Sequence, residues 1–327
     1  MPTRLIGAVA VLLLLPLGAC SDADPAGAGD AASSPADREQ KADDGREGRP
    51  DEDHPGGASD PGGDAGELAD EVEDLAQAEP RIAPRTGPVI GADISWPQCP
   101  KGMGIPEKRT LGMPMPVDAA EYVVLGLTNG PAFTPNPCLA DQVAWVKDRG
   151  LMAAAYSVTS YPDDATLRRL GDDGPFNAGS ATGRLRNVGY QQALYNIATL
   201  EEVGLDTPVV WIDVEPVTHF EWSSDLGANA HVVAGVARGY TDAGYRIGIY
   251  STPYLWAVVV GDFSLGGVPE WRAAGQTSQR EALDRCGPDW SIQGGPAVMG
   301  QWVEARRDMN VTCPGISADL ARWFHPY

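Results

Sequence analysis

Two patterns of apolar positions alternate along residues 88–327. Short apolar runs rich in β-branched residues, bounded by proline, glycine or polar residues, predict buried strands. Longer stretches with apolar residues three or four positions apart predict helices. Strands are expected at residues 89–95, 122–128, 152–158, 209–215, 245–250, 270–274, 298–303 and 309–312. Helices are expected at residues 139–149, 188–203, 228–243 and 254–260.

The order of these elements predicts the fold class. Strands that alternate with helices through short connections form a parallel sheet, and about eight such strands close into a barrel. The helices become sparse toward the C-terminus, so the expected fold is an irregular α/β barrel of the TIM-like (β/α) type. Residues 88–327 are enough for one large domain of this kind.

The strand at residues 209–215 carries the main candidate chemistry. Its sequence, Val-Val-Trp-Ile-Asp-Val-Glu, lies between Pro208 and Pro216. Alternate residues of a strand share a face, so Asp213 and Glu215 project together, with their Cα atoms about 6.6 Å apart. Buried carboxylates are costly unless they are hydrogen-bonded, paired or functional. A pair of carboxylates that cleaves a glycosidic bond is the leading explanation, and this spacing permits both retaining and inverting geometries.

Further polar residues end the other predicted strands. In barrels of this type the chemistry gathers at the C-terminal ends of the strands, and Asp93 and Asp308 are predicted to join the pair there. Neighbouring carboxylates and apolar walls raise the pKa of a general acid toward working pH, and Glu215 is the candidate acid. The aromatic residues expected to offer faces to sugar rings are Trp96, Tyr156, Trp211, Tyr250 and Trp302.

A structural explanation competes with the catalytic one. Ion-pair networks also place acids at strand ends. Asp213 and Glu215 would then pair with a basic side chain, for which Arg184, Arg306 and Arg307 are the candidates.

Five short motifs resemble, in order, those of the family 25 glycoside hydrolases, the Chalaropsis-type lysozymes. They are Gly-Ala-Asp-Ile-Ser at 91–95, Trp-Ile-Asp-Val-Glu at 211–215, Gly-Ile-Tyr-Ser at 248–251, Gln-Trp at 301–302 and Asp-Met-Asn at 308–310. The resemblance covers nearly the whole of residues 88–327. It implies a barrel of five strand–helix units followed by three strands.

The resemblance also implies roles for the site residues. Glu215 would be the general acid, and Asp213 would stabilise charge or orient the N-acetyl group of the substrate. Asp93 and Asp308 would tune the acid and line the subsite, and Gln301 and Asn310 are expected to bind substrate. The implied substrate is the glycan of peptidoglycan, cut at the N-acetylmuramic acid linkage. No metal or organic cofactor is implied.

The chain departs from the family pattern in four places, one of which is the reduction of the family's Trp-Gln-Tyr to Gly-Gln-Trp at residues 300–302. The second strand ends without the Lys and Glu of the family motif, and the third ends in Tyr-Ser-Val at residues 156–158 instead of a sequence similar to Tyr-His-Phe. An insertion at residues 97–116 is foreign to the typical lysozyme. These features indicate a divergent branch. The alternative function is therefore a barrel that has lost turnover and binds cell-wall glycan or a wall protein.

The first residues predict export. Arg4 precedes an apolar run at residues 5–17, and this pattern is typical of a secretory signal. The ending Leu-Gly-Ala-Cys at residues 17–20 resembles a bacterial lipoprotein signal, which would leave Cys20 as a lipidated first residue on the outer face of the cell membrane. The alternative is an ordinary secreted protein cut near Ala19. Residues 1–20 are accordingly assigned as the signal peptide.

Residues 21–87 are expected to be a disordered tether between the membrane and the barrel domain at 88–327. Residues 21–80 hold 19 acidic and 4 basic side chains, a net charge of −15 out of −21 for the chain. Low hydrophobicity with high net charge predicts disorder. The acidity argues against a nucleic-acid partner, and the domain is expected to be a monomer.

Four cysteines remain after Cys20, and an even number in an exported chain predicts two disulfides. Four cysteines allow three pairings. Cys99–Cys138 and Cys286–Cys313 are favoured because each joins neighbouring segments. The spacings contain no Cys-x-x-Cys and no nearby histidine, which argues against a zinc site.

Overall fold

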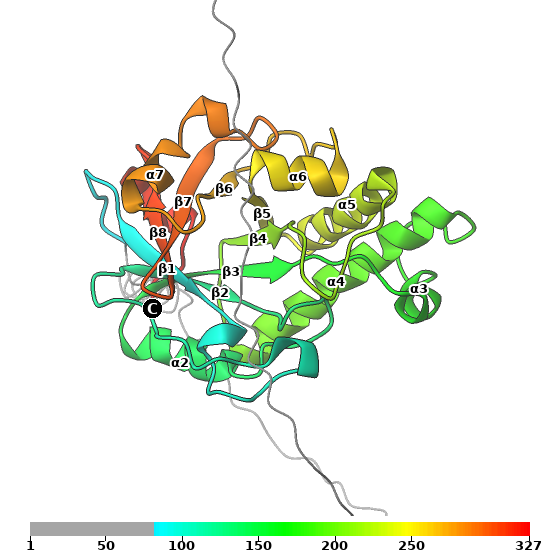
Figure 1. The fold of residues 1–327 in the computed structure, drawn as a ribbon, viewed down its shortest axis with the longest axis horizontal. Helices are drawn as coiled ribbons and strands as arrows, with labels where there is room; N and C mark the ends of the chain where they lie inside the picture. The colour runs from blue at the N-terminus through cyan, green and yellow to red at the C-terminus, as the bar shows by residue number, and fades with distance from the viewer. Residues whose placement is uncertain (1–81) are drawn as a thin grey trace, which may run out of the picture. The chain divides into compact units, whose positions relative to one another are not determined.

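The computed structural model describes residues 82–327, in which eight strands form a closed barrel (Figure 1). Each of the first six strands runs parallel to the next, and the eighth is antiparallel to both β7 and β1. The strands are β1 (Ile90–Ile94), β2 (Tyr122–Gly126), β3 (Met152–Val158), β4 (Val209–Asp213), β5 (Arg246–Ser251), β6 (Glu270–Ala273), β7 (Ala297–Glu304) and β8 (Arg307–Thr312). The predicted α/β barrel is confirmed, with its strands close to the expected positions.

The helices are unevenly distributed around the barrel. The α-helices are α2 (Leu139–Asp148), α3 (Asp164–Leu170), α4 (Ala181–Val203), α5 (Leu226–Asp242), α6 (Pro253–Val260) and α7 (Gln279–Asp284). The 3-10 helices are η1 (Trp96–Gln98), η2 (Pro106–Lys108), η3 (Pro288–Trp290) and η4 (Ile316–Arg322). The connection from β1 to β2 contains only η1 and η2, so the irregularity of the barrel begins at its first crossover as well as at its end.

Helices α3 and α7 were not expected from the apolar pattern, because both are short. Their first turns nevertheless carry recognisable caps. The side chain of Asp163 accepts a hydrogen bond from the Thr166 N–H, and that of Ser278 accepts one from the Glu281 N–H. Such acceptors satisfy amide groups that have no partner within the helix. The capping residues were therefore the signal that the apolar pattern lacked.

The two faces of β4 enter different cores. Val210, Ile212 and Val214 face outward and pack in the cluster formed with the helices. Val209 and Trp211 face inward and pack in the barrel interior. Because side chains alternate along a strand, Asp213 and Glu215 belong to the inward series, as the sequence predicts.

The C-terminal segment closes the barrel at the N-terminal ends of the strands. Phe324 stacks on Tyr122 at the start of β2, with ring centroids 4.1 Å apart. His325 exchanges backbone hydrogen bonds with Ala153 near the start of β3. Trp323 packs against Trp211 inside the barrel. The opposite end, where the strands finish, is left for the acidic residues.

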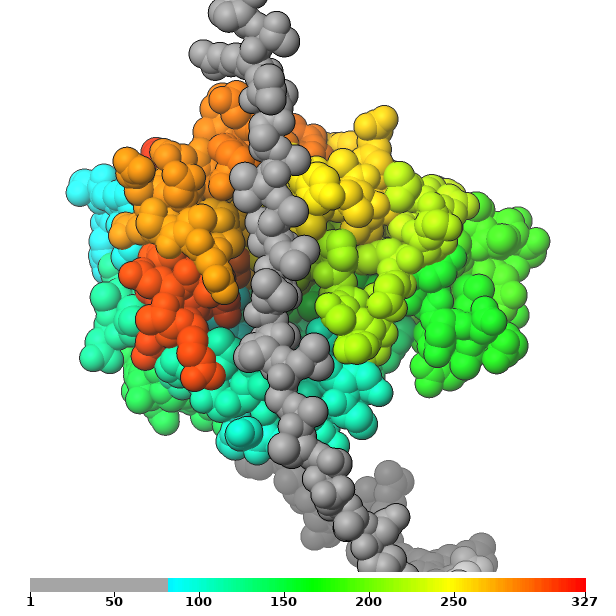
Figure 2. All heavy atoms as spheres, viewed as in Figure 1, coloured from blue at the N-terminus to red at the C-terminus, as the bar shows by residue number. Residues whose placement is uncertain are grey.

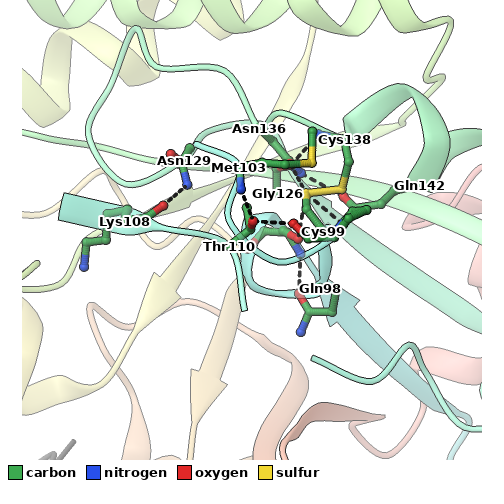
Figure 3. The surroundings of a disulfide bond; sticks show 12 residues. Gln98, Cys99, Met103, Lys108, Thr110, Gly126, Asn129, Asn136, Cys138 and Gln142 are labelled. Atoms are coloured by element: carbon green, nitrogen blue, oxygen red, sulfur yellow. Dashed lines mark hydrogen bonds between the residues drawn. A yellow bond between two sulfur atoms is a disulfide. The ribbon is translucent and has the colours of Figure 1, made fainter. Parts of the chain in front are cut away.

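Both predicted disulfides are confirmed. Cys99 bonds to Cys138 and Cys286 bonds to Cys313, each with a Cα–Cα distance of 5.6 Å. The first bond ties the start of residues 97–116, called the insertion loop below, to the N-terminus of α2 (Figure 3). In the space-filling view, the cyan-to-turquoise insertion loop and the yellow-green connection after β4 both reach the face toward the viewer (Figure 2).

The ordered contacts of the barrel begin before residue 88. Ile82 packs against the interior core, and the Arg85 guanidinium lies 3.2 Å from the Glu121 carboxylate. Within residues 82–327, no helix has the length and apolar character needed to cross a bilayer. The predicted signal peptide, Cys20 and nearly all of the tether lie outside the described residues.

Candidate active site

Four acidic side chains come together at the C-terminal ends of the strands. Asp93 lies on β1 directly opposite Asp308 on β8. Asp213 ends β4, and Glu215 follows it by two residues. Asp93 and Asp213 are buried, whereas Glu215 and Asp308 are partly exposed. Three strands distant in sequence thus place a cluster of carboxyl groups at one end of the barrel.

Asp93 is held by a network of amide and aromatic side chains. The side-chain amides of Gln301 and Asn310 donate hydrogen bonds of 2.9 and 2.7 Å to Asp93 Oδ1. The Tyr250 hydroxyl donates to Gln301 Oε1, and the Trp271 indole N–H donates to Asn310 Oδ1, both at 2.7 Å. Because each aromatic donor occupies an amide oxygen, both NH₂ groups must point toward Asp93.

This network corrects the sequence-based roles of Asn310 and Gln301. Asn310 is completely buried, and both amides have their oxygen and nitrogen occupied by Asp93 and the aromatic donors. Each amide keeps a second N–H and a second lone pair, but the side chains are at most 6% exposed, so a sugar has little access to them. Both orient the carboxyl group of Asp93 instead.

The pKa of Asp93 is raised well above its usual range. Burial is the largest cause, and the nearby charge of Asp308 raises the pKa further. The hydrogen bonds from Gln301 and Asn310 act in the opposite direction because they favour the ionised carboxylate. Burial prevails, so Asp93 favours its protonated form inside the cluster.

Asp213 is the least satisfied acid of the cluster. Its pKa is raised well above the usual range, first by burial and then by the charges of Glu215 and Asp93. Its Oδ1 atom is buried and has no hydrogen-bond partner among the described residues. An unpaired buried polar atom costs about 1–3 kcal/mol. Asp213 therefore has an acceptor position available at the end of β4.

The backbone around Glu215 is fixed from two directions. The Val214 N–H donates to the Tyr250 carbonyl at 3.1 Å, and the Ser251 hydroxyl donates to the Val214 carbonyl at 2.7 Å. The Trp222 indole N–H donates to the Glu215 carbonyl at 2.9 Å. The main chain is thus held by β5 and by the connection that follows β4, while the Glu215 side chain stays partly exposed.

Glu215 titrates near neutral pH. Burial raises its pKa to about 7, against the lowering effect of the Lys108 charge and with a further raising effect from Asp308. Burial also raises the pKa of Asp308 to about 6, although a hydrogen bond from the Gln98 side chain lowers it. A carboxyl group that keeps its proton near neutral pH has the property required of a general acid.

A family model and a curated relative match parts of this chain. The family model described as lysozyme-like protein 1 (Lys-1) matches residues 182–281, which include Asp213 and Glu215. A curated relative, probable GH family 25 lysozyme 3 of Dictyostelium discoideum, is 31% identical over 125 residues. The alignment covers 37% of this chain and 23% of the relative. The barrel is similar to the family 25 lysozymes.

Three solved structures match the chain at low sequence identity. The muramidase from Trichobolus zukalii matches with a TM-score of 0.46 and 15% identity, over 72% of this chain and 99% of that one. The muramidase from Acremonium alcalophilum matches with a TM-score of 0.44 and 14% identity, over 72% and 99%. The autolysin LytC of Streptococcus pneumoniae was solved with a synthetic peptidoglycan ligand. It matches with a TM-score of 0.41 and 13% identity, over 69% of this chain and 46% of that one.

Two of the predicted sugar platforms in this lysozyme-like barrel are wrong. Trp211 is completely buried and packs against Trp271 and Trp323 in the barrel interior. It shares a face with Asp213 but lies two residues deeper. Trp302 is 3% exposed and faces outward, because the neighbouring Gln301 faces inward and side chains alternate along a strand. Neither indole has a face open to a sugar.

Three other predicted aromatics remain at the open end. Trp96, Tyr156 and Tyr250 are partly exposed. Tyr156 and Tyr250 both contact the Trp271 ring, with centroids 5.7 and 4.5 Å away. Contact of these three with a sugar stays a prediction.

The structure does not show the ion pairs offered as the competing explanation. Arg184 pairs with Asp172, and Arg307 donates to the Met115 carbonyl. Within residues 82–327, no basic side chain forms an ion pair with Asp213 or Glu215. In the same part of the chain, no group of three His, Cys, Asp or Glu side chains is arranged to hold a metal ion.

Sequence reasoning missed Lys108, Gln98 and Trp271 as site residues. Trp271 had a signal, since its strand was predicted and alternation places one face of that strand inside the barrel. Lys108 and Gln98 belong to the connection after β1, which follows no apolar period. Only the three-dimensional course of that connection brings them to the acids.

Proposed function

We propose that this chain is an exported glycoside hydrolase that cleaves peptidoglycan glycan as a lysozyme or muramidase does. One observation carries the proposal: the partly exposed Glu215 carboxyl stands among three other acids, and burial there raises its pKa to about 7. The similarity to family 25 lysozymes supports the choice of substrate. The matched regions cover only part of this chain and of the curated relative, so the activity of the whole protein is part of the proposal.

In the proposed reaction Glu215 donates its proton to the glycosidic oxygen as the bond to the sugar breaks. Asp213, two residues before Glu215 and on the same face of the strand, stabilises the developing positive charge or orients the N-acetyl group. Asp93 and Asp308 keep the local environment rich in carboxyl groups, which disfavours ionisation of Glu215. Water then adds to the anomeric carbon and gives up a proton that restores the acid form of Glu215, which completes the hydrolysis.

The proposed place of action is the outer face of the cell membrane. The signal and the Cys20 motif predict a lipid anchor, and residues 21–87 would act as the spacer that lets the barrel domain at 88–327 reach the wall. The predicted partners are thus cell-wall glycan and, through the lipid on Cys20, the membrane. Replacing Cys20 by alanine should release the protein from the membrane fraction, and retention there would refute the anchor.

The decisive test uses the chain from residue 21 onward with purified peptidoglycan. New reducing ends should form with the wild type and disappear in Glu215→Gln. The mass of the products identifies the cleaved linkage, and the anomer released first distinguishes retention from inversion. Reducing ends that persist in Glu215→Gln would refute its role as the acid.

The second candidate is a barrel that binds wall glycan without cleaving it. One observation favours it: Asn129, just after β2, is committed to holding the insertion loop, at a position where the family motif places charged side chains. Sedimentation of the wild type with peptidoglycan, with no new reducing ends after long incubation, would select this function.

A further inference from the structure

The insertion loop brings a basic residue to the acidic end of the barrel. It replaces the first crossover helix and runs from η1 to the approach to β2. Its start is bonded to α2 through Cys99–Cys138. Within the loop, backbone hydrogen bonds join Gly102 to Thr110 and Thr110 to Met103. The loop is thus an ordered structure with its own internal support.

Asn129 fixes the loop directly above the end of β2. This side chain is completely buried, and its Oδ1 accepts a hydrogen bond from the Ile105 N–H at 3.0 Å. Its Nδ2 donates to the Lys108 carbonyl, also at 3.0 Å. Figure 3 shows this second bond, with the Lys108 side chain extending away from the disulfide. The backbone of Lys108 is therefore anchored to the barrel itself.

The Lys108 side chain runs along a space kept open by a glycine. A Cβ atom added at Gly130 would lie 2.9 Å from Lys108 Cγ and 3.4 Å from the Phe220 ring. Lys108 Nζ lies 5.9 Å from the centroid of the Trp96 ring. The residue is partly buried, and among the described residues its ammonium makes no hydrogen bond and no ion pair within 4 Å. Its three donors remain available to a ligand.

The charge of this ammonium reaches the acid of the site. It lowers the pKa of Glu215. Burial lowers the pKa of Lys108 itself, and the charge of Glu215 acts in the opposite direction. The C-terminal end of the barrel otherwise carries four carboxyl groups, and any of them that is ionised repels an anionic substrate group. The Lys108 ammonium instead attracts an anionic substrate group at this point of the site.

We infer that Lys108 is a specificity-determining residue that binds a carboxylate carried by the sugar next to Glu215. This inference rests on the proposed function, and it names the substrate class more closely. In peptidoglycan glycan such a carboxylate is the lactyl group of a muramic acid whose stem peptide has been removed. The barrel would then prefer peptide-free, acidic strands.

The test compares two forms of one substrate. Peptide-free glycan strands keep the lactyl carboxylates, and the same strands after chemical reduction carry neutral alcohols. Kd is measured at low temperature by calorimetry, and initial rates are measured in parallel. The wild type should bind the acidic strands about tenfold more tightly, as one charge-assisted hydrogen bond predicts.

The variants isolate the lysine. Lys108→Met should lose the preference for acidic strands, and Lys108→Arg should retain it. Lys101→Met is the matched control, because Lys101 is exposed on the same loop, and it should bind as the wild type does. Circular dichroism and melting of each variant establish that the loop change leaves the barrel folded.

The outcomes separate this inference from the proposed function. Equal affinity of the wild type for both strands, or a preference that survives in Lys108→Met, would overturn the inference even if cleavage occurs. An equal loss of kcat on both strands in Lys108→Met, with unchanged Kd, would also overturn it, since the lysine would then act only on the Glu215 proton. A lysine-dependent preference without any cleavage would support the inference and refute the hydrolase.

Discussion

Glu270 and Asp213 are both buried acids at the barrel wall, and their oxygens are satisfied very differently. Glu270 Oε1 accepts hydrogen bonds from the backbone N–H groups of Gln293 and Gly295, both at 2.9 Å. Its Oε2 accepts one from the Ile292 N–H and one from Arg272 Nε, at 2.9 and 2.8 Å, and Arg272 Nη2 forms an ion pair with it at 2.7 Å. Asp213, in contrast, has a buried oxygen with no partner among the described residues.

The hydrogen bonds to these two acids distinguish a structural carboxylate from a candidate catalytic one. The Glu270 carboxylate fastens the loop at residues 292–295 to β6, so its charge is balanced within the fold. The acids at the open end face one another, and burial opposes their ionisation. A fold retains such an arrangement at a cost to its stability, which is typical of active sites. The comparison predicts that substitutions at the two places will change different properties.

The largest expected effect is the loss of turnover in Glu215→Gln. Removing a general acid should lower kcat for glycan hydrolysis by about 10²–10⁴-fold, because the leaving oxygen is no longer protonated. The free energy of unfolding should change little. Glu221→Gln is the matched control, since Glu221 is exposed in the connection after β4. This variant should hydrolyse the glycan at the wild-type rate. Full activity in Glu215→Gln would refute the role of Glu215 as the general acid.

The next effect is the destabilisation caused by Glu270→Gln. The change leaves the buried Arg272 guanidinium without its charged partner, which should lower the free energy of unfolding by about 3–5 kcal/mol. Chemical denaturation measures this loss. Glu121→Gln, which breaks the exposed pair with Arg85, should cost at most about 1 kcal/mol. The folded fraction of Glu270→Gln should keep its kcat, and a selective loss of kcat would place Glu270 in the site.

Asp213→Asn should show the reverse behaviour. Replacing a poorly satisfied carboxyl by a neutral amide should leave the free energy of unfolding at pH 7 unchanged or raise it by about 1 kcal/mol. Hydrolysis should fall because the developing charge is no longer stabilised. Denaturation and initial rates measured on the same preparation test both statements. A marked destabilisation with full activity would make Asp213 a structural acid like Glu270.

The smallest effect concerns pH. The folded pKa values of Glu215, about 7, and Asp308, about 6, lie above their unfolded values near 4, so the folded state binds more protons between these limits. The contribution of these two groups to the stability of the folded state is therefore complete below pH 4, and it is lost as the pH rises to 7. Melting temperatures of the wild type should fall over this range more than those of Glu215→Gln. Parallel curves would contradict the raised pKa.

The same pH argument applies to activity. Glu215 must be protonated to act, so the rate should decline as the pH rises through about 7. A rate that keeps rising above pH 8 would mean that another group donates the proton.

The sequence was sufficient wherever a short local pattern determines the outcome. Apolar runs located the strands, and alternation placed Asp213 and Glu215 on the inner face of β4. The disulfides followed from the proximity of segments in the chain. The same alternation, applied to Gln301, would have shown that Trp302 faces outward.

The rest depends on contacts between distant segments. Asn310 is recognisable as part of a motif, but only its burial beside Trp271 shows that it orients Asp93. Lys108 lies in an irregular loop, and its position is determined by Asn129 and the Cys99–Cys138 bond. No local period encodes such a placement, because it arises from the course of the chain after the barrel has closed.

The closure of the barrel by an antiparallel last strand constrains how this protein folds. β1 pairs with β8, and the Val89 N–H bonds to the Thr312 side chain 223 residues away. The barrel therefore cannot close until nearly the whole domain has been synthesised. Such long-range pairing makes folding slow. The acidic site draws on β1, β4 and β8, so it is complete only once the barrel has closed.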